Sequence, residues 1–126
     1  MPPKPILIVE DEPDGADLVR RLLKTIGGET QVTDNAESAL GLLSATPDGY
    51  RAVITDLALP EMDGFELMQA IRADAALSHL PLIAITAFHT PELRVRALEG
   101  GFDGYFPKPL DPSAFAVSLV RVLNGG

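Results

Sequence analysis

Five short apolar segments alternate along the chain with five segments of helical periodicity, and this alternation narrows the possible folds most. The first segment, Ile6–Val9, is apolar throughout, which is typical of a strand covered on both faces. The apolar residues that follow have the spacing of one helix face: Leu18, Val19, Leu22, Leu23 and Ile26. Strands that alternate with helices predict an α/β protein, in which right-handed connections give a parallel sheet with helices on both faces.

The remaining elements are predicted from the same signals. We expect strands over 30–33, 52–56, 82–86 and 104–106. We expect helices to begin at Asp34 (with Glu37 completing a capping box), after Asp63-Gly64, at Thr90-Pro91 and at Asp111-Pro112. The segment 30–33 is polar at alternate positions, which favours the edge of the sheet. With that strand at the edge, the natural strand order is 2-1-3-4-5.

Size and composition exclude several classes of function. The 126 residues, 46% of them hydrophobic, suffice for one folded domain. The net charge of −8 would repel phosphates, so we expect no direct binding of nucleic acid. The sequence has no cysteine, which excludes disulfides, thiolate catalysis and cysteine-based zinc sites. Because no segment resembles a membrane span or a signal peptide, we expect a cytoplasmic protein without membrane contact.

Acidic side chains follow two of the predicted strands at their carboxyl ends, the edge at which parallel α/β sheets bind ligands. Glu10 and Asp11 follow the first strand, and Asp56 ends the third. These strands are neighbours in the predicted order, so the three carboxylates should converge. Two carboxylates about 4 Å apart repel by roughly 4 kcal/mol at an intermediate effective dielectric, and a raised pKa or a bound cation has to offset this.

Two further side chains complete the chemistry of this edge. Oxygen ligands without His or Cys point to a hard cation, with Mg²⁺ as the first choice. Thr86, at the end of the fourth strand, supplies a hydroxyl group, and Lys108, beyond the fifth, supplies a mobile positive charge. Taken singly, Thr86 is typical of a strand and Lys108 of a protein surface. Together with the acids they suit phosphoryl transfer to a carboxylate.

Four motifs, in this order and each at the end of a predicted strand, give the chain its resemblance to a known family. They are ILIVEDE, ITDLALPEMDG, AITA and YFPKP. The sequence from about residue 6 to residue 123 resembles the receiver domain of bacterial two-component response regulators. The resemblance implies a flavodoxin-like (βα)₅ fold, with residues 1–126 as a single receiver domain without an output domain. The pattern is most similar to the single-domain regulators of cell division and of signalling relays.

The resemblance also implies how the acids act. Asp56 would accept a phosphoryl group from a phosphohistidine on a sensor histidine kinase or a histidine phosphotransfer protein. Mg²⁺, with Mn²⁺ as a substitute, would be held by Asp11 directly, by Glu10 through water, by Asp56 and by the backbone carbonyl of Ala58. The protein would therefore be a signalling phosphoacceptor rather than an enzyme, and a monomer or a weak phosphorylation-dependent dimer.

The other site residues would respond to the phosphoryl group. The resemblance implies that Lys108 pairs with the phosphate and that Lys108-Pro109 is a cis peptide. Thr86 would donate a hydrogen bond to the phosphate and shift toward it. Tyr105 would turn inward behind Thr86 and so change the face made by the fourth helix, the fifth strand and the fifth helix.

Three residues depart from the family pattern. Ala58 lacks a polar group that would orient an attacking water, and Phe88 is apolar where many relatives are polar. Both departures predict slow hydrolysis of the aspartyl phosphate. Phe102 stands where the family usually has a small residue, so its packing is left open by the sequence.

Other classes of function fit less well. A phosphatase of the haloacid-dehalogenase type needs a second acid at the position of Ala58, and a dinucleotide-binding module needs a phosphate-cradling turn where this chain has VEDEPDG. A receiver-like module that acts by protein contact without phosphate remains the alternative. For His79 and His89 we expect exposed, structural positions.

Overall fold

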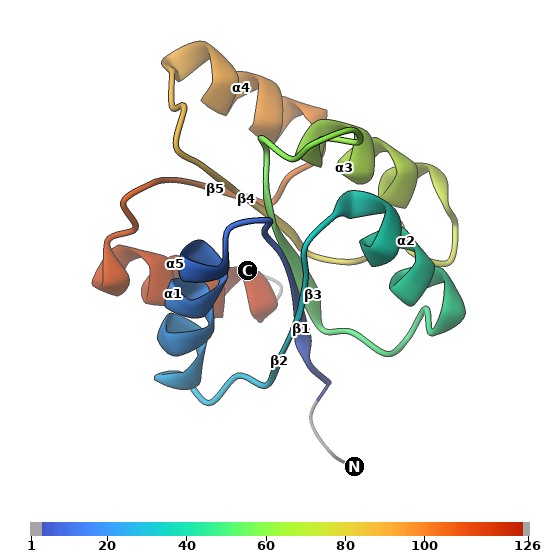
Figure 1. The fold of residues 1–126 in the computed structure, drawn as a ribbon, viewed down its shortest axis with the longest axis horizontal. Helices are drawn as coiled ribbons and strands as arrows, with labels where there is room; N and C mark the ends of the chain where they lie inside the picture. The colour runs from blue at the N-terminus through green and yellow to red at the C-terminus, as the bar shows by residue number, and fades with distance from the viewer. Residues whose placement is uncertain (1–3, 125–126) are drawn as a thin grey trace.

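The computed structural model describes residues 4–124, and these residues form five alternating β-α units (Figure 1). In chain order the elements are β1 (Ile6–Val9), α1 (Pro13–Lys24), β2 (Thr30–Thr33), α2 (Ala36–Ala45), β3 (Ala52–Asp56), α3 (Gly64–Ala73), β4 (Leu82–Thr86), α4 (Pro91–Gly100), β5 (Gly104–Pro107) and α5 (Pro112–Leu123). The predicted (βα)₅ organisation is therefore confirmed. The fifth strand ends one residue later than the sequence indicated.

The strands form one parallel sheet in the order β2-β1-β3-β4-β5, as predicted. The register decides which residues leave the sheet together. Val9 of β1 lies opposite Thr55 of β3, so the residues that follow them, Glu10 and Asp56, emerge side by side at the carboxyl edge. Thr86 of β4 lies opposite Pro107 of β5, which brings Lys108 to the same edge.

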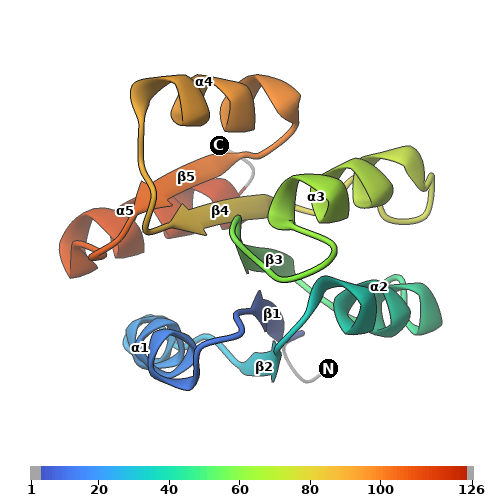
Figure 2. The same ribbon diagram turned by 45° about the horizontal axis from the view of Figure 1, so that its top comes forward.

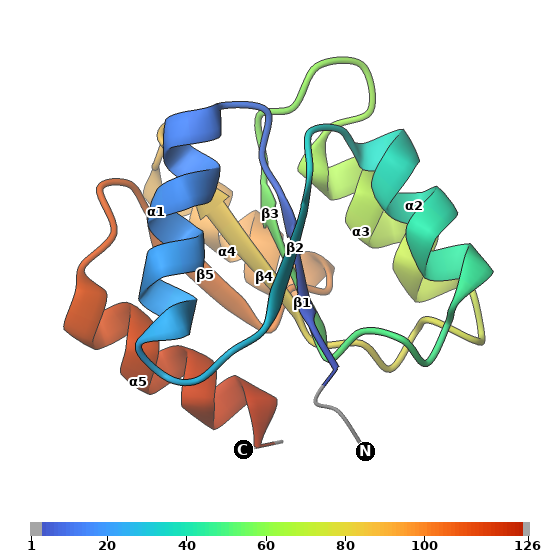
Figure 3. The same ribbon diagram turned by 60° about the horizontal axis from the view of Figure 1, so that its bottom comes forward.

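The sheet lies between α1 and α5 on one side and α2 and α3 on the other (Figure 3). An apolar layer packs against each of its faces. Alternate residues of each central strand point to opposite faces. Leu7 and Val53 pack into the layer under α2, α3 and α4, whereas Ile8 and Ile54 pack into the layer under α1 and α5. Figure 2 shows α4 lying over β4 and β5, on the opposite side of the sheet from α5. Because both faces are covered, the central strands are apolar except at their carboxyl ends, where Thr55, Asp56 and Thr86 lie.

Three of the four predicted helix starts are confirmed, and one is wrong. Asp63 caps α3 in a capping box with Glu66, and the side chains of Thr90 and Asp111 cap α4 and α5. For α2 the N-cap is Asn35 rather than Asp34, because the Asn35 side chain accepts a hydrogen bond from the backbone N–H of Ser38 at 2.7 Å.

Glu37, which we expected to complete a capping box at the start of α2, makes a different contact. Instead of closing a capping box, the Glu37 carboxylate accepts a hydrogen bond from the backbone N–H of Met62 at 3.2 Å. This contact ties α2 to the loop that joins β3 to α3. The sequence pattern alone did not distinguish a local partner for Glu37 from one 25 residues away.

Phe102 is accommodated in the core. Its side chain is buried, and its ring meets that of Phe65 edge to face with the ring centroids 6.0 Å apart. The bulky residue therefore fills the space between α3 and the start of β5. Among the described residues, no helix is both long and apolar enough to cross a membrane.

Gly64 sits so close beneath the end of β3 that it has no room for a side chain. A Cβ atom at Gly64 would lie 2.5 Å from the carbonyl oxygen of Asp56 and 2.8 Å from Cα of Leu57. We expect Gly64→Ala to lower the free energy of unfolding by about 1–3 kcal/mol, the usual range for overpacking, in urea denaturation monitored by circular dichroism.

Gly41, which is exposed in α2, provides the matched control. A Cβ atom there would meet no atom within 4 Å. Gly41→Ala should raise the free energy of unfolding by about 0.5–1 kcal/mol, because alanine restricts the unfolded chain and favours helix. Equal effects of the two substitutions would contradict the assignment of a close contact at Gly64.

Candidate functional site

The structure brings the three predicted acids together at the carboxyl edge of the sheet. One carboxylate oxygen from each of Glu10, Asp11 and Asp56 lies within 4.8 Å of the other two. Glu10 and Asp56 are buried, whereas Asp11 is exposed to solvent. The convergence follows from the pairing of β1 with β3, as the strand order predicted.

Lys108 lies between the two buried acids. Its Nζ atom donates hydrogen bonds to Oε2 of Glu10 at 2.9 Å and to Oδ2 of Asp56 at 2.8 Å. The backbone N–H of Lys108 donates to the carbonyl of Thr86 at 2.7 Å, which fixes where the side chain starts. The peptide bond between Lys108 and Pro109 is cis, as the resemblance implied.

The pKa values in this cluster are shifted by burial and by the close charges. Burial raises the pKa of Glu10; the hydrogen bond from Lys108 opposes this in part, the charge of Asp56 adds to it, and the net pKa is raised. Burial lowers the pKa of Lys108, but its bonds to Asp56 and Glu10 outweigh burial, so the net pKa lies above its ordinary value. Lys108 therefore stays protonated at neutral pH.

The donor set fits a hard divalent cation. When the acids are ionised, three carboxylates face one ammonium group, which leaves two uncompensated negative charges. All the available side-chain donors are carboxylate oxygens, the ligands that Mg²⁺ prefers. The exposed Asp11 gives the cluster an open side toward solvent.

The carboxylate of Asp56 is held at both oxygens. Oδ1 accepts a hydrogen bond from the backbone N–H of Ala58 at 2.9 Å, and Oδ2 accepts from Lys108. These contacts orient the group toward the acidic cluster without filling all of its lone pairs. The side chain of Ala58 has no polar atom to add to them.

Thr86 and Tyr105 lie on neighbouring strands and are both buried. Oγ1 of Thr86 accepts a hydrogen bond from the backbone N–H of Phe88 at 3.0 Å, so its own proton remains available for donation. The hydroxyl of Tyr105 is 2.9 Å from Nδ1 of His89. Burial raises the pKa of Tyr105, and the positive charge of Arg94 opposes this in part.

His89 is exposed, as predicted, but no local pattern in the sequence indicates its contact with Tyr105. The two residues are 16 positions apart, and their approach depends on the path of the loop between β4 and α4. His79 is exposed in the loop before β4, as expected. Phe88 leaves 71% of its surface exposed, which agrees with a loop residue rather than a core residue.

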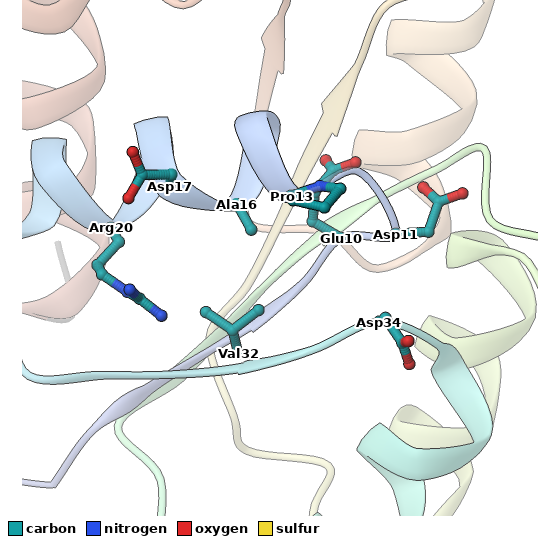
Figure 4. A pocket seen from close by; sticks show the side chains of 8 residues that line it. All are labelled: Glu10, Asp11, Pro13, Ala16, Asp17, Arg20, Val32 and Asp34. Atoms are coloured by element: carbon teal, nitrogen blue, oxygen red, sulfur yellow. The ribbon is translucent and has the colours of Figure 1, made fainter.

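A pocket of about 390 Å³ opens beside the acidic cluster, between α1 and the end of β2 (Figure 4). Glu10 and Asp11 line one end of the pocket, near Asp34. At the other end, Arg20 extends from α1 toward Val32 of β2. The pocket therefore borders the cluster on its α1 side and has both charged and apolar walls.

Loss of the Lys108 ammonium would leave two buried carboxylates unpaired. We expect Lys108→Met to lower the free energy of unfolding at pH 7 by about 3–5 kcal/mol, as is usual when one partner of a buried ion pair is removed. The exposed Lys24 provides the control, and Lys24→Met should change stability by less than about 0.5 kcal/mol. Both values come from urea denaturation.

The deficit in the free energy of unfolding of Lys108→Met, relative to the parent, should change with pH in both the acid and the alkaline range. Because the folded-state pKa of Glu10 is raised above 4.5, its buried charge costs stability at neutral pH, and the deficit should shrink as the pH falls toward 4.5. The folded-state pKa of Lys108 is raised above 10.5, so its contribution in the parent is complete below that pH and is lost above it. A deficit independent of pH would contradict this assignment.

Comparison with known proteins agrees with the fold. The family model described as the response regulator receiver domain matches residues 6–119. The chemotaxis protein CheY-3 of Vibrio cholerae is 35% identical over 94% of this chain and 91% of its own length. The polar-differentiation response regulator DivK of Brucella anthropi is 36% identical over 97% of this chain and 98% of its own.

A solved structure is similar over nearly the whole chain. It is the receiver domain of the sensor histidine kinase PA1611 from Pseudomonas aeruginosa, with a magnesium ion coordinated in its active site cleft. It is 28% identical in sequence, has a TM-score of 0.84, and the match covers 98% of this chain and 99% of that one. The sheet order and the acids at the strand ends agree with the family model that matches residues 6–119. The chain therefore belongs to the response regulator receiver domain family of two-component signalling.

Proposed function

We propose that this receiver domain is a phosphoacceptor, and that Asp56 takes a phosphoryl group from a phosphohistidine on a sensor histidine kinase or a histidine phosphotransfer protein. One observation carries the proposal. Asp56 ends β3 with its carboxylate held by Ala58 and Lys108, within 4.8 Å of carboxylate oxygens from Glu10 and Asp11. This arrangement presents an oriented nucleophile beside the charges that phosphoryl transfer requires.

Glu10, Asp11, Asp56 and the backbone carbonyl of Ala58 would hold Mg²⁺, with Mn²⁺ as a substitute. The two uncompensated negative charges of the cluster and its oxygen donors support this choice of metal. So does the magnesium ion in the cleft of the PA1611 receiver domain. When bound, the cation would neutralise charge on the phosphoryl oxygens.

The chemical step involves one bond formed and one broken. A carboxylate oxygen of Asp56 bonds to phosphorus while the bond between phosphorus and the donor's imidazole nitrogen breaks, and that nitrogen keeps the electron pair. Lys108 then transfers its hydrogen bond from the carboxylates to a phosphoryl oxygen, and its raised pKa keeps it cationic for this role. Thr86 donates a hydrogen bond from its hydroxyl, which here only accepts one from Phe88, to a second phosphoryl oxygen.

Movement of Thr86 would carry the signal to the face made by α4, β5 and α5. Tyr105 lies behind Thr86 on the neighbouring strand and contacts the loop that leads into α4. The receiver would act as a monomer or as a weak phosphorylation-dependent dimer in the cytoplasm. It would promote only its own phosphorylation and slow dephosphorylation.

Acetyl phosphate and Mg²⁺ test the phosphoacceptor directly. Intact-mass measurement should show the addition of one phosphoryl group to the parent chain and none to Asp56→Asn, because the amide is not a nucleophile. Asp48→Asn, which removes an exposed acid from the loop before β3, should be phosphorylated like the parent. Chelation of the metal with EDTA should prevent the addition of the phosphoryl group to the parent chain.

A folded parent chain that gains no mass would reject the proposal. It would instead favour a receiver-like module that acts by protein contact without phosphate. Circular dichroism on the same samples establishes that each chain is folded.

The lifetime of the aspartyl phosphate tests the role of Ala58. Because neither Ala58 nor Phe88 offers a polar group to orient water, we expect slow decay of the phosphorylated mass after the phosphodonor is removed. Ala58→Asn should speed the decay by about 10-fold, the effect of one added hydrogen bond worth about 1.4 kcal/mol in the transition state. A parent lifetime of seconds would contradict this expectation.

A further inference from the structure

The loop between β3 and α3, residues 57–63, carries Ala58, whose carbonyl is one of the proposed ligands of the metal. Its first residues are fixed by contacts with the sheet. The backbone N–H of Leu57 donates to the carbonyl of Ile85 at 3.0 Å, and that of Ala58 donates to the Asp56 carboxylate at 2.9 Å. This end of the loop is therefore held by the strands that it leaves.

The middle of the loop contains an unfavourable backbone conformation. Glu61 is exposed, and among residues 4–124 it is the one residue other than glycine with a positive φ, 62°. A side chain in this left-handed region crowds the backbone, so the surrounding structure has to hold the residue there. On one side Leu59 is buried in the core, and on the other Met62 is bound by Glu37.

Glu37 reaches this loop from another element. It lies in the first turn of α2, and Figure 2 and Figure 3 show the start of α2 beside the loop. The carboxylate accepts a hydrogen bond at 3.2 Å from the backbone N–H of Met62, the residue directly after Glu61. Met62 also packs, partly buried, against the core. The contact therefore holds the strained turn against α2.

We propose that Glu37 is a positioning residue for the metal site: its bond to Met62 holds the strained backbone at Glu61, and with it the conformation of the loop that carries Ala58. The inference rests on the proposed function, in which the carbonyl of Ala58 is a metal ligand. Without the bond, the loop would populate conformations in which Glu61 has relaxed to negative φ. Metal binding would then have to restore the strained conformation, which weakens the observed affinity.

Titration of the full chain with MgCl₂, followed by the NMR chemical shifts of the backbone amides, tests the proposal without phosphodonor. Glu37→Ala should raise the Kd for Mg²⁺ by about 2- to 10-fold, the effect of one lost hydrogen bond. Glu37→Gln keeps an acceptor oxygen and should bind Mg²⁺ like the parent. Both variants lose the same charge, so a purely electrostatic effect would weaken them equally.

Glu92 provides the matched control. It is exposed and is the second residue of α4, as Glu37 is the second residue of α2. Glu92→Ala should leave the Kd for Mg²⁺ unchanged. A Glu37→Ala chain that binds Mg²⁺ like the parent overturns the proposal. So does a Glu37→Gln chain that binds as weakly as Glu37→Ala, or a Glu92→Ala chain that is weakened to the same extent.

A double-mutant cycle tests the link to Glu61. Asparagine adopts positive φ with little strain, so in the Glu61→Asn background Glu37→Ala should change the Kd for Mg²⁺ by less than about twofold. The charge that Glu61→Asn removes cancels in this comparison, because both chains lack it. An effect as large as the one in the parent background would overturn the proposal.

The titration also separates this inference from the proposed function, because Mg²⁺ binding needs no phosphoryl transfer. A parent chain that binds Mg²⁺ but gains no mass from acetyl phosphate rejects the phosphoacceptor and leaves the comparison of the Glu37 variants valid. A parent chain that gains mass, beside a Glu37→Ala chain that binds Mg²⁺ equally well, rejects only the positioning role. A parent chain that binds no Mg²⁺ overturns both the metal site and the positioning role.

Discussion

The ammonium group of Lys108, held between Glu10 and Asp56, is the interaction on which the site depends. The pairing of β1 with β3 places two buried carboxylates side by side, an arrangement that is unfavourable without a cation. Lys108 supplies that cation from beyond β5, and its bond to Glu10 joins residues 98 positions apart. The same bond therefore relieves repulsion at the centre of the sheet and ties its last strand to its first.

Much of the fold could be predicted because its signals are local. Runs such as Ile6–Val9 identify buried parallel strands, and a capping residue before proline identifies the starts of α4 and α5. The start of α2 was predicted one residue early because Asp34 and Asn35 are both competent caps. The backbone path of the preceding loop decides between them, and Glu37 finds its partner in a distant loop instead.

The positions of the site residues followed from strand order, since residues after neighbouring parallel strands must meet at one edge. That rule predicts that Glu10, Asp11 and Asp56 lie together, as they do. Their roles in metal binding and phosphoryl transfer are part of the proposed function. It could not reveal the approach of His89 to Tyr105, because loop conformation carries no periodic signal. Nor does it reveal contacts such as those of Arg72, whose guanidinium group bonds the carbonyl of Gly101 and the carboxylate of Asp103.

Tyr105 and Phe106 are adjacent in β5, yet they belong to different sides of the protein. Tyr105 packs in the layer under α4, whereas Phe106 packs on the opposite face against Phe115 of α5. A rearrangement of the α4 layer therefore need not disturb the helices beneath the sheet. The sheet keeps the apolar layer that contains Tyr105 apart from the layer that contains Phe106, so the two halves of the molecule pack independently of one another.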